Sequence, residues 1–212
     1  MSKISFYKLH KTRKQLLFKN KDNDFCVIDG QNKVLISSPH GVPQVRLGKP
    51  KVAEPGSLAT ALALQQGTNS FLIAKTKNTF VDANFDEITA YKLKVFDLIE
   101  KEHIKYFLDF HGLAAHRTMD VNLGVHMGQN IETNPGLLDN LHKTLEDSGF
   151  VVSIDKPFWG SRRTLTGSVK NKFEKVWTIQ IEINCSITNN KENFDKWQKL
   201  LGALSSWINK LR

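Results

Sequence analysis

The amino-acid sequence predicts a single α/β domain with a mixed, mostly parallel central sheet and helices on both of its faces. Short apolar segments alternate along the chain with longer segments of helical periodicity, and this order is typical of a sheet that is covered on both faces. The length of 212 residues suits one large domain and is short for two. We find no internal repeat and no Pro/Ser-rich linker.

Five apolar runs carry the strand prediction, and punctuating residues set their limits. The predicted strands are residues 25–29, 33–37, 70–74, 104–110 and 176–184. Pro55 suits the first turn of a helix that runs to about Gln66 and ends at Gly67. Residues 49–54 lie between two prolines and are predicted to be irregular.

Three further helices follow from caps and spacing. Asp86 is a plausible N-cap for a helix to about His103. Its apolar residues recur every three or four positions, and the expected buried stripe is Ile88, Tyr91, Val95 and Ile99. Pro135 opens a helix that ends at Gly149, and the last helix spans residues 192–211. In the strand at 176–184, apolar and polar residues alternate, so Glu182 lies on its polar face.

The charge and the cysteines limit the classes of partner. The net charge of +9 is spread along the chain, with a basic N-terminal segment at residues 1–21. No finger spacing or RNA-binding aromatic motif is present, so we expect no specific nucleic acid as a partner. No apolar run is long enough to span a membrane, and none is expected as a partner. Cys26 and Cys185, isolated in a chain without a secretory signal, predict buried free thiols and a cytoplasmic location.

Two histidines follow predicted strands, and each precedes a glycine. His40 comes after the strand at 33–37, and His111 comes after the strand at 104–110. Ligands in such folds gather at the carboxyl ends of the strands, and catalytic zinc in hydrolases commonly has two His and one carboxylate ligand. Asp109 precedes His111 by two residues, so it could orient a ligand. Glu182, partly desolvated on its strand, is a candidate for proton transfer.

These segments together resemble the N-formylglutamate amidohydrolase family, a branch of the zinc carboxypeptidase-like enzymes. The matching segments are residues 38–41, 51–57, 82–84, 109–112 and 180–184. The resemblance implies a phosphorylase/hydrolase-like fold and one zinc ion held by His40 and His111. It implies that Glu182 is the general acid/base, that Asn84 lies near the substrate, and that residues 158–164 form a substrate loop.

The chain departs from the family pattern at two positions. Position 43 is Pro43, where related enzymes commonly place a Glu ligand, so Glu54 is the expected third ligand and Asp82 the alternative. Phe85 stands where the family often has an arginine that could hold a substrate carboxylate. The arginines that could replace it are Arg162, Arg163, Arg117 and Arg46.

The sequence therefore predicts a zinc-dependent hydrolase that cleaves an amide bond of a small, acidic N-acyl amino acid or a short peptide. The alternatives are a metallopeptidase or peptidoglycan amidase of the same fold, and a non-catalytic basic binding module. The Gly-x-Ser-x-Gly pattern of serine hydrolases and the Gly-rich phosphate loop are both absent from the sequence.

Overall fold

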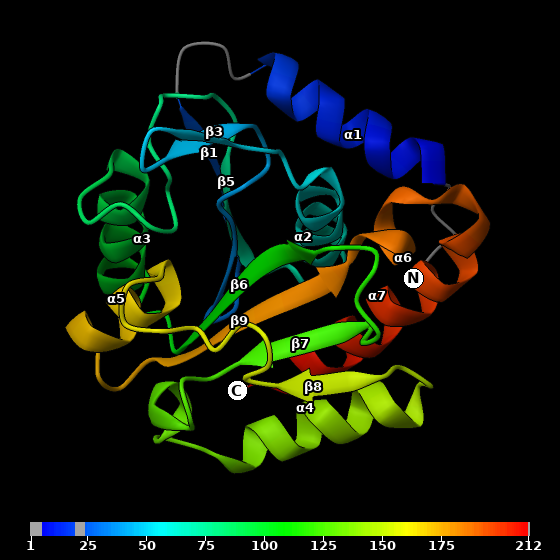
Figure 1. Cartoon of the computed structure of the whole chain (residues 1–212). Coiled ribbons are helices and arrows are strands. Elements are labelled where there is room, and N and C mark those ends of the chain that lie inside the picture. The colour runs from blue at the N-terminus through cyan, green and yellow to red at the C-terminus, as the bar shows by residue number, and fades with distance from the viewer. Residues whose placement is uncertain (1–5, 20–23, 212) are drawn as a thin grey trace.

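The computed structural model describes residues 6–19 and 24–211, and its centre is a seven-stranded sheet (Figure 1). The strand order is β1-β5-β2-β6-β9-β7-β8. β5, β2, β6 and β9 run parallel, whereas β1 and β7 run antiparallel to their inner neighbours. The strands are β1 (Phe25–Ile28), β2 (Val34–Ser38), β5 (Phe71–Lys75), β6 (Tyr106–Leu113), β7 (Val121–Gly124), β8 (Val152–Ile154) and β9 (Trp177–Asn184). The predicted mixed, mostly parallel sheet is confirmed.

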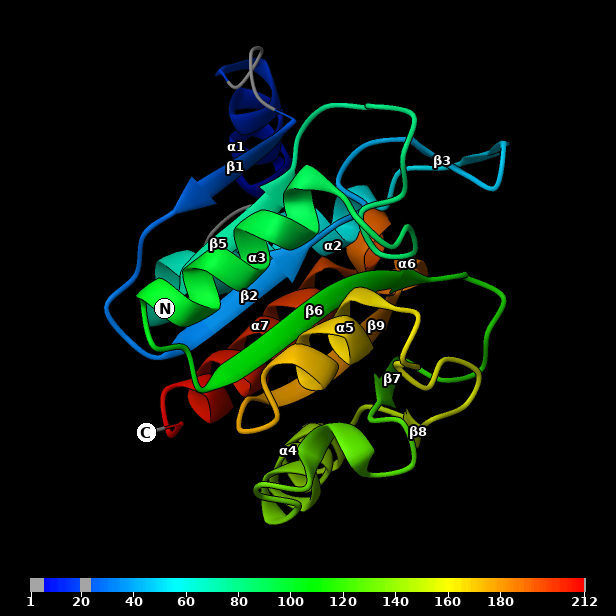
Figure 2. The ribbon, with the colours of Figure 1, turned by 90° about the vertical axis from the view of Figure 1, so that its left-hand side faces the viewer.

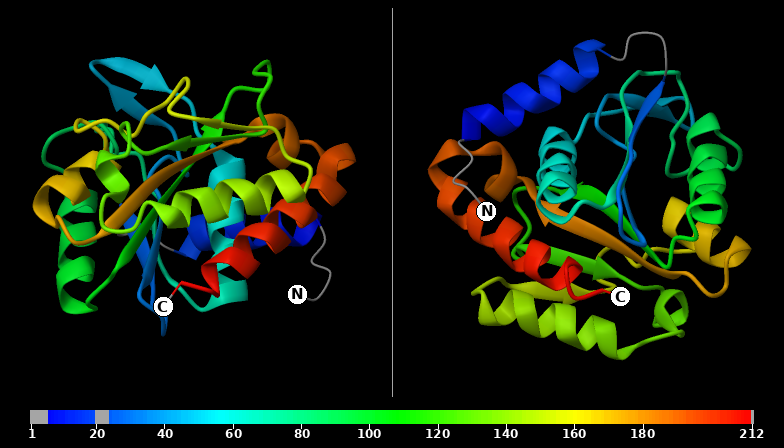
Figure 3. Two further views of the ribbon diagram at one scale, coloured as in Figure 1. Left: turned by 90° about the horizontal axis from the view of Figure 1, so that it is seen from below. Right: turned by 180° about the vertical axis from the view of Figure 1, so that it is seen from behind.

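Helices cover both faces of this sheet, as predicted (Figures 1 and 3). α3 and α5 lie on one face, which Figure 2 shows from the front, and α2 and α7 lie on the other. The α-helices are α1 (Phe6–Lys19), α2 (Pro55–Thr68), α3 (Ala90–Lys101), α4 (Gly136–Asp147), α5 (Leu165–Lys172), α6 (Cys185–Asn189) and α7 (Phe194–Ile208). Two 3₁₀ turns are η1 (Gln129–Ile131) and η2 (Lys191–Asn193).

Each sheet face has its own apolar core because successive side chains of a strand point to opposite faces. On β6, Phe107 packs in the core under α3 and α5, whereas Leu108 and Phe110 pack in the core under α2 and α7. The same alternation directs Asp109 and His111 to the α3/α5 face. On the α3/α5 face, apolar side chains therefore give way to polar side chains toward the carboxyl ends of the strands.

The start of α3 differs from the sequence prediction. The helix begins at Ala90 because Thr89 caps it, its side chain accepting a hydrogen bond from Lys92 N (3.1 Å). Asp86, the predicted cap, instead accepts a hydrogen bond from Asp82 N (2.7 Å). Ile88 consequently precedes the helix and is 77% exposed, so its predicted burial is wrong.

Three other element limits also differ. Residues 49–51 form strand β4 (Lys49–Lys51), which pairs with β3 (Gln44–Arg46) instead of being irregular. Pro50 is tolerated there because the two-stranded hairpin has free edges. α2 runs through Gly67 and ends at Thr68, and the following cap residue, Asn69, takes the left-handed conformation (φ 55°). β6 continues to Leu113, so His111 lies within the strand rather than after it.

The basic N-terminal segment contains helix α1, which packs on α2 and buries Leu9. Residues 1–5 and 20–21 of that segment lie outside the described residues. Among the described residues, no helix has both the length and the apolar character that crossing a membrane requires. Cys26 and Cys185 are free thiols, and both are partly exposed rather than buried.

Candidate metal centre

The carboxyl ends of β2 and β6 bring two histidines together. The strands are parallel neighbours, with Ser37 opposite Asp109. His40 lies in the turn that follows β2, and His111 lies near the end of β6. Their Nδ1 atoms are 3.0 Å apart, and both side chains are buried. The fold thus closes a separation of 71 residues in sequence.

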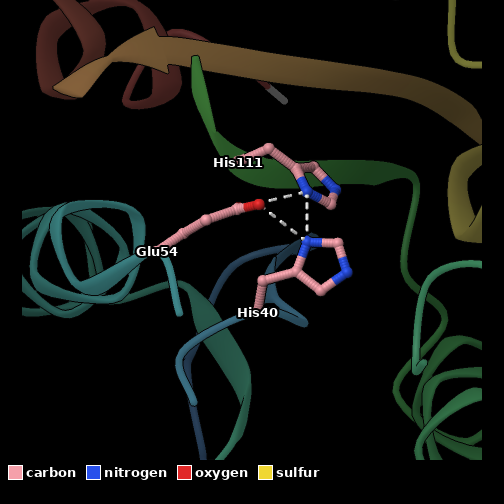
Figure 4. A group of neighbouring side chains, drawn as sticks. All are labelled: His40, Glu54 and His111. Atoms are coloured by element: carbon pink, nitrogen blue, oxygen red, sulfur yellow. Dashed lines mark hydrogen bonds and ion pairs between the residues drawn. The ribbon is translucent and has the colours of Figure 1, made fainter. Parts of the chain in front are cut away.

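Glu54 completes the group from the N-terminus of α2 (Figure 4). Its backbone N–H donates to the carbonyl oxygen of His40 (2.8 Å), which holds the segment before α2 against the turn after β2. Its Oε1 atom lies 3.1 Å from His40 Nδ1, and its Oε2 atom lies 3.5 Å from His111 Nδ1. Gly112 N and Lys51 Nζ donate to the same carboxylate, at 2.9 and 2.6 Å.

The cluster, by which we mean His40, Glu54 and His111, has the donor set and spacing of a zinc site. One ligand atom from each residue can be chosen so that all lie within 4.8 Å of one another. Tetrahedral ligands at zinc bond lengths lie about 3.3 Å apart. The two Nδ1 atoms are 3.0 Å apart, and the carboxylate of Glu54 reaches His40 with Oε1 (3.1 Å) and His111 with Oε2 (3.5 Å). Two imidazoles and one carboxylate also leave a fourth position open for catalysis. The residues present therefore fit a zinc ion.

A carboxylate holds the outer nitrogen of each histidine. Asp82 Oδ1 lies 2.9 Å from His40 Nε2, and Asp109 Oδ2 lies 3.1 Å from His111 Nε2. Arg46 Nε donates to Asp82 Oδ2 (2.6 Å), and Thr166 Oγ1 donates to Asp109 Oδ2 (3.3 Å). Such outer carboxylates fix the ring orientation and raise the basicity of a metal-binding histidine. This arrangement favours Glu54 over Asp82 as the third ligand, because Asp82 lies behind His40.

The histidines and the carboxylates beside them shift one another's pKa values. Burial alone would raise the pKa of Glu54, but the charge of His40 and hydrogen bonds from both histidines lower it well below its usual value. The pKa of Asp82 is also lowered, because hydrogen bonds and charge from His40 and Arg46 outweigh its burial. Burial would lower the pKa of His111, but the charge and hydrogen bond of Asp109 raise it well above its usual value.

Glu182 faces the cluster from β9 but lacks comparable partners. It pairs in register with His111 on the neighbouring strand and is only 5% exposed. Its one hydrogen bond among the described residues comes from Gln180 Nε2 (2.6 Å). Burial raises the pKa of Glu182 to about 7, and the charge of His111 only partly opposes this shift. A carboxyl of this kind can exchange a proton near neutral pH.

The predicted substrate residues have different surroundings. Asn84 is buried, and its Oδ1 accepts a hydrogen bond from Leu165 N (2.7 Å), which ties the Asp82 loop to the start of α5. Arg162 and Arg163 are exposed and line one pocket with Phe85. Arg117 is exposed on the loop after β6, and its carbonyl oxygen accepts from Asn184 Nδ2 (3.0 Å). The structure thus groups two of the four predicted arginines in one pocket.

Sequence reasoning passed over other contributors to this region. Arg46 was considered only as an anion-binding residue, yet its Nε atom bonds to Asp82 and its guanidinium lies over the Phe85 ring (5.1 Å to the centroid). Gln180 precedes Glu182 by two residues, and the two-residue period of a strand would have placed both on one face. For Lys51 and Lys92 the sequence offers no signal beyond their charge.

Comparison with solved structures shows the same fold in several proteins. A gene product of Agrobacterium tumefaciens aligns with a TM-score of 0.68 and 12% identity, covering 93% of this chain and 97% of that one. The N-formylglutamate amidohydrolase of Ralstonia eutropha aligns with a TM-score of 0.61 and 16% identity, covering 89% and 96%. A metallo-carboxypeptidase of Burkholderia cenocepacia aligns with a TM-score of 0.56 and 12% identity, covering 96% and 69%.

No protein-family model matches the chain, and no curated protein matches it by sequence. At identities of 12–16%, the structural likeness concerns the arrangement of the backbone. The chain therefore has the fold of these proteins, which include an amidohydrolase and a metallo-carboxypeptidase, and it carries a histidine–carboxylate cluster at the carboxyl edge of its sheet.

Proposed function

We propose that the protein is a zinc-dependent hydrolase that cleaves the amide bond of a small, acidic N-acyl amino acid. The observation that carries the proposal is the cluster itself, two imidazole nitrogens and one carboxylate at zinc-ligand spacing. Its fold is also that of an N-formylglutamate amidohydrolase, the family that the sequence motifs resemble. His40, Glu54 and His111 would hold one zinc ion.

Zinc in such a site lowers the pKa of water to about 7 and polarises a carbonyl group. The residues of this chain would do the rest. Glu182 accepts the proton of the attacking water and delivers it to the leaving nitrogen, a role that its raised pKa of about 7 supports. Asp82 and Asp109 keep the two imidazoles oriented with Nδ1 toward the cluster. Asn84, Arg162, Arg163 and Arg117 are the candidates for substrate contacts.

A peptidase activity is the second candidate, because the chain also has the fold of a metallo-carboxypeptidase. The same cluster and the same Glu182 would serve both reactions, since both cleave an amide bond. Comparing turnover of N-formyl and N-acetyl amino acids with that of short peptides and peptidoglycan fragments separates these activities. Faster turnover of the peptides would replace the first candidate with the second.

Metal stoichiometry tests the proposal directly. We expect one zinc ion per chain in the wild-type protein and a loss of zinc in His40→Ala and His111→Ala, as measured by elemental analysis of untagged protein. His142→Ala is the matched control, because His142 lies on α4 and pairs with Glu146 at the surface. No bound metal in the wild-type protein, even after incubation with zinc, would overturn the hydrolase and favour a basic binding module.

A further inference from the structure

A pocket on the α3/α5 face of the sheet has cationic lining that the reaction chemistry does not use. Its volume is about 460 Å³, and Phe85, Lys92, Arg162, Arg163 and Ser168 are among its lining residues. Phe85 directly follows Asn84, which connects the Asp82 loop to α5. The pocket therefore opens beside the segment that holds His40 through Asp82.

Lys92 is the unusual member of this lining. It lies in the first turn of α3, and only 2% of its surface is exposed. Its Nζ atom makes one long hydrogen bond, to Ser168 Oγ (3.3 Å), and no ion pair within the described part of the chain. An ammonium group has three donors, and a buried charge without a partner is costly. Burial lowers the pKa of Lys92, and the charge of Asp109 only partly opposes this shift.

The other lining charges decide which ligand fits. Arg162 and Arg163 are exposed and, among the described residues, form no ion pair. Asp86 also lines the pocket, but its Oδ2 atom accepts from Asp82 N, and Glu87 is exposed. The charges of Asp82 and Asp109 also reach Lys92, but these carboxylates are paired with His40, Arg46 and His111. In the lining itself, three cations against two carboxylates leave one positive charge, which suits a singly charged carboxylate group better than a phosphate group with nearly two charges.

We propose that this pocket is a carboxylate subsite, with Lys92 as the specificity-determining residue at its buried end and Arg162 and Arg163 at its exposed side. The inference rests on the proposed function in one respect, that the bound carboxylate belongs to the N-acyl amino acid. The carboxylate would occupy the two free donors of Lys92, while the amide bond reaches the cluster. The arginine that the sequence lacks at position 85 is thus replaced by a lysine from another element.

Anion binding tests the subsite without relying on turnover. Glutarate and inorganic phosphate are titrated calorimetrically into the full chain, both as purified and after chelation of metal. We expect glutarate to bind more tightly than phosphate, and Lys92→Met to weaken glutarate binding about 10- to 100-fold, the loss expected for a hydrogen bond to a charged group. Lys94→Met is the matched control, because Lys94 lies on the same helix and pairs with Asp97 at the surface.

Failure of the wild-type protein to bind glutarate, or equal binding by Lys92→Met, would overturn the subsite whatever the metal content. Tighter binding of phosphate would overturn the carboxylate assignment. If the hydrolase is active, Lys92→Met should raise KM for a carboxylate substrate much more than it lowers kcat, and it should leave the zinc content unchanged. Absence of zinc from the wild-type protein as purified would count against the proposed function alone. Glutarate binding to the chelated protein tests the subsite separately.

Discussion

The cluster and the groups beside it differ in how completely their polar atoms are paired. In His40 and His111, all four ring nitrogens have a partner, and those partners are mostly carboxylates. Beside them, Glu182 has one amide partner, and Lys92 has one long hydrogen bond. Both regions lie on the same face of the sheet and are similarly buried, so burial does not explain the difference.

This difference indicates two kinds of task. A site whose side chains hold one another in place is organised to keep an ion in a fixed geometry. Polar groups that are buried without a full set of partners instead destabilise the free protein. Binding of a proton or a ligand removes that penalty. We therefore expect substitutions at His40, His111 and their carboxylate partners to alter metal binding. Substitutions at Glu182 and Lys92 should alter turnover and substrate choice.

The largest effect should come from Glu182→Gln, which removes the charge of a buried group with few partners and leaves the cluster unchanged. We expect turnover to fall about 10²- to 10⁴-fold, the usual contribution of a general acid/base, while the zinc content stays unchanged. In the wild-type protein, kcat/KM should rise with pH as Glu182 loses its proton, and this limb should vanish in the variant. Zinc would shift that limb below the pKa of about 7.

The matched control is Glu100→Gln, a change at an exposed glutamate of α3. Steady-state kinetics from pH 5 to 9 and elemental analysis on the same samples are sufficient for this test. Near-wild-type turnover by Glu182→Gln with zinc bound would show that another group moves the proton.

The sequence was most informative where one residue both follows a strand and carries unusual chemistry. His40 and His111 could be paired because parallel neighbouring strands end at the same edge of a sheet. Glu54 is harder to place, since its position depends on the turn after His40 and on the start of α2. The segment at residues 49–54 is recognisable from its flanking prolines, whereas its pairing in β4 and its return to the cluster depend on tertiary contacts.

Elements without a clear periodicity escaped prediction for physical reasons. β7 has four residues, Val121–Gly124, and gains its stability from pairing with β9. α5 has a polar sequence and a short length, and its start is fixed by the Thr164 cap and the contact with Asn84. Because α5 supplies Thr166 and Ser168, the sequence could not place Lys92 beside a pocket. Periodicity thus locates the scaffold, but long-range contacts set the surroundings of the site.

A smaller effect should follow from Asp109→Asn, which weakens the support of His111 without removing a proposed metal ligand. The variant keeps the shape of the side chain but loses the charge that orients and polarises His111. We expect zinc affinity to fall about 10- to 100-fold, as is usual for such outer carboxylates, in a competition titration against a chromophoric chelator. Asp97→Asn on the surface of α3 is the control. Unchanged affinity in Asp109→Asn would mean that the pairing of His111 has no bearing on metal binding.

A last effect concerns stability, and here the substitution of Glu182 should stabilise the protein. The pKa of Glu182 rises from 4.5 to about 7 on folding, so between these values the folded chain binds more protons than the unfolded chain. Stability of the chelated wild-type protein should therefore fall as pH rises through this interval. Glu182→Gln lacks that loss, so it should match the wild-type protein at pH 4 and be more stable by about 3 kcal/mol at pH 8. Urea unfolding at both pH values measures the difference, and an equal difference at both would mean that folding does not raise the pKa of Glu182.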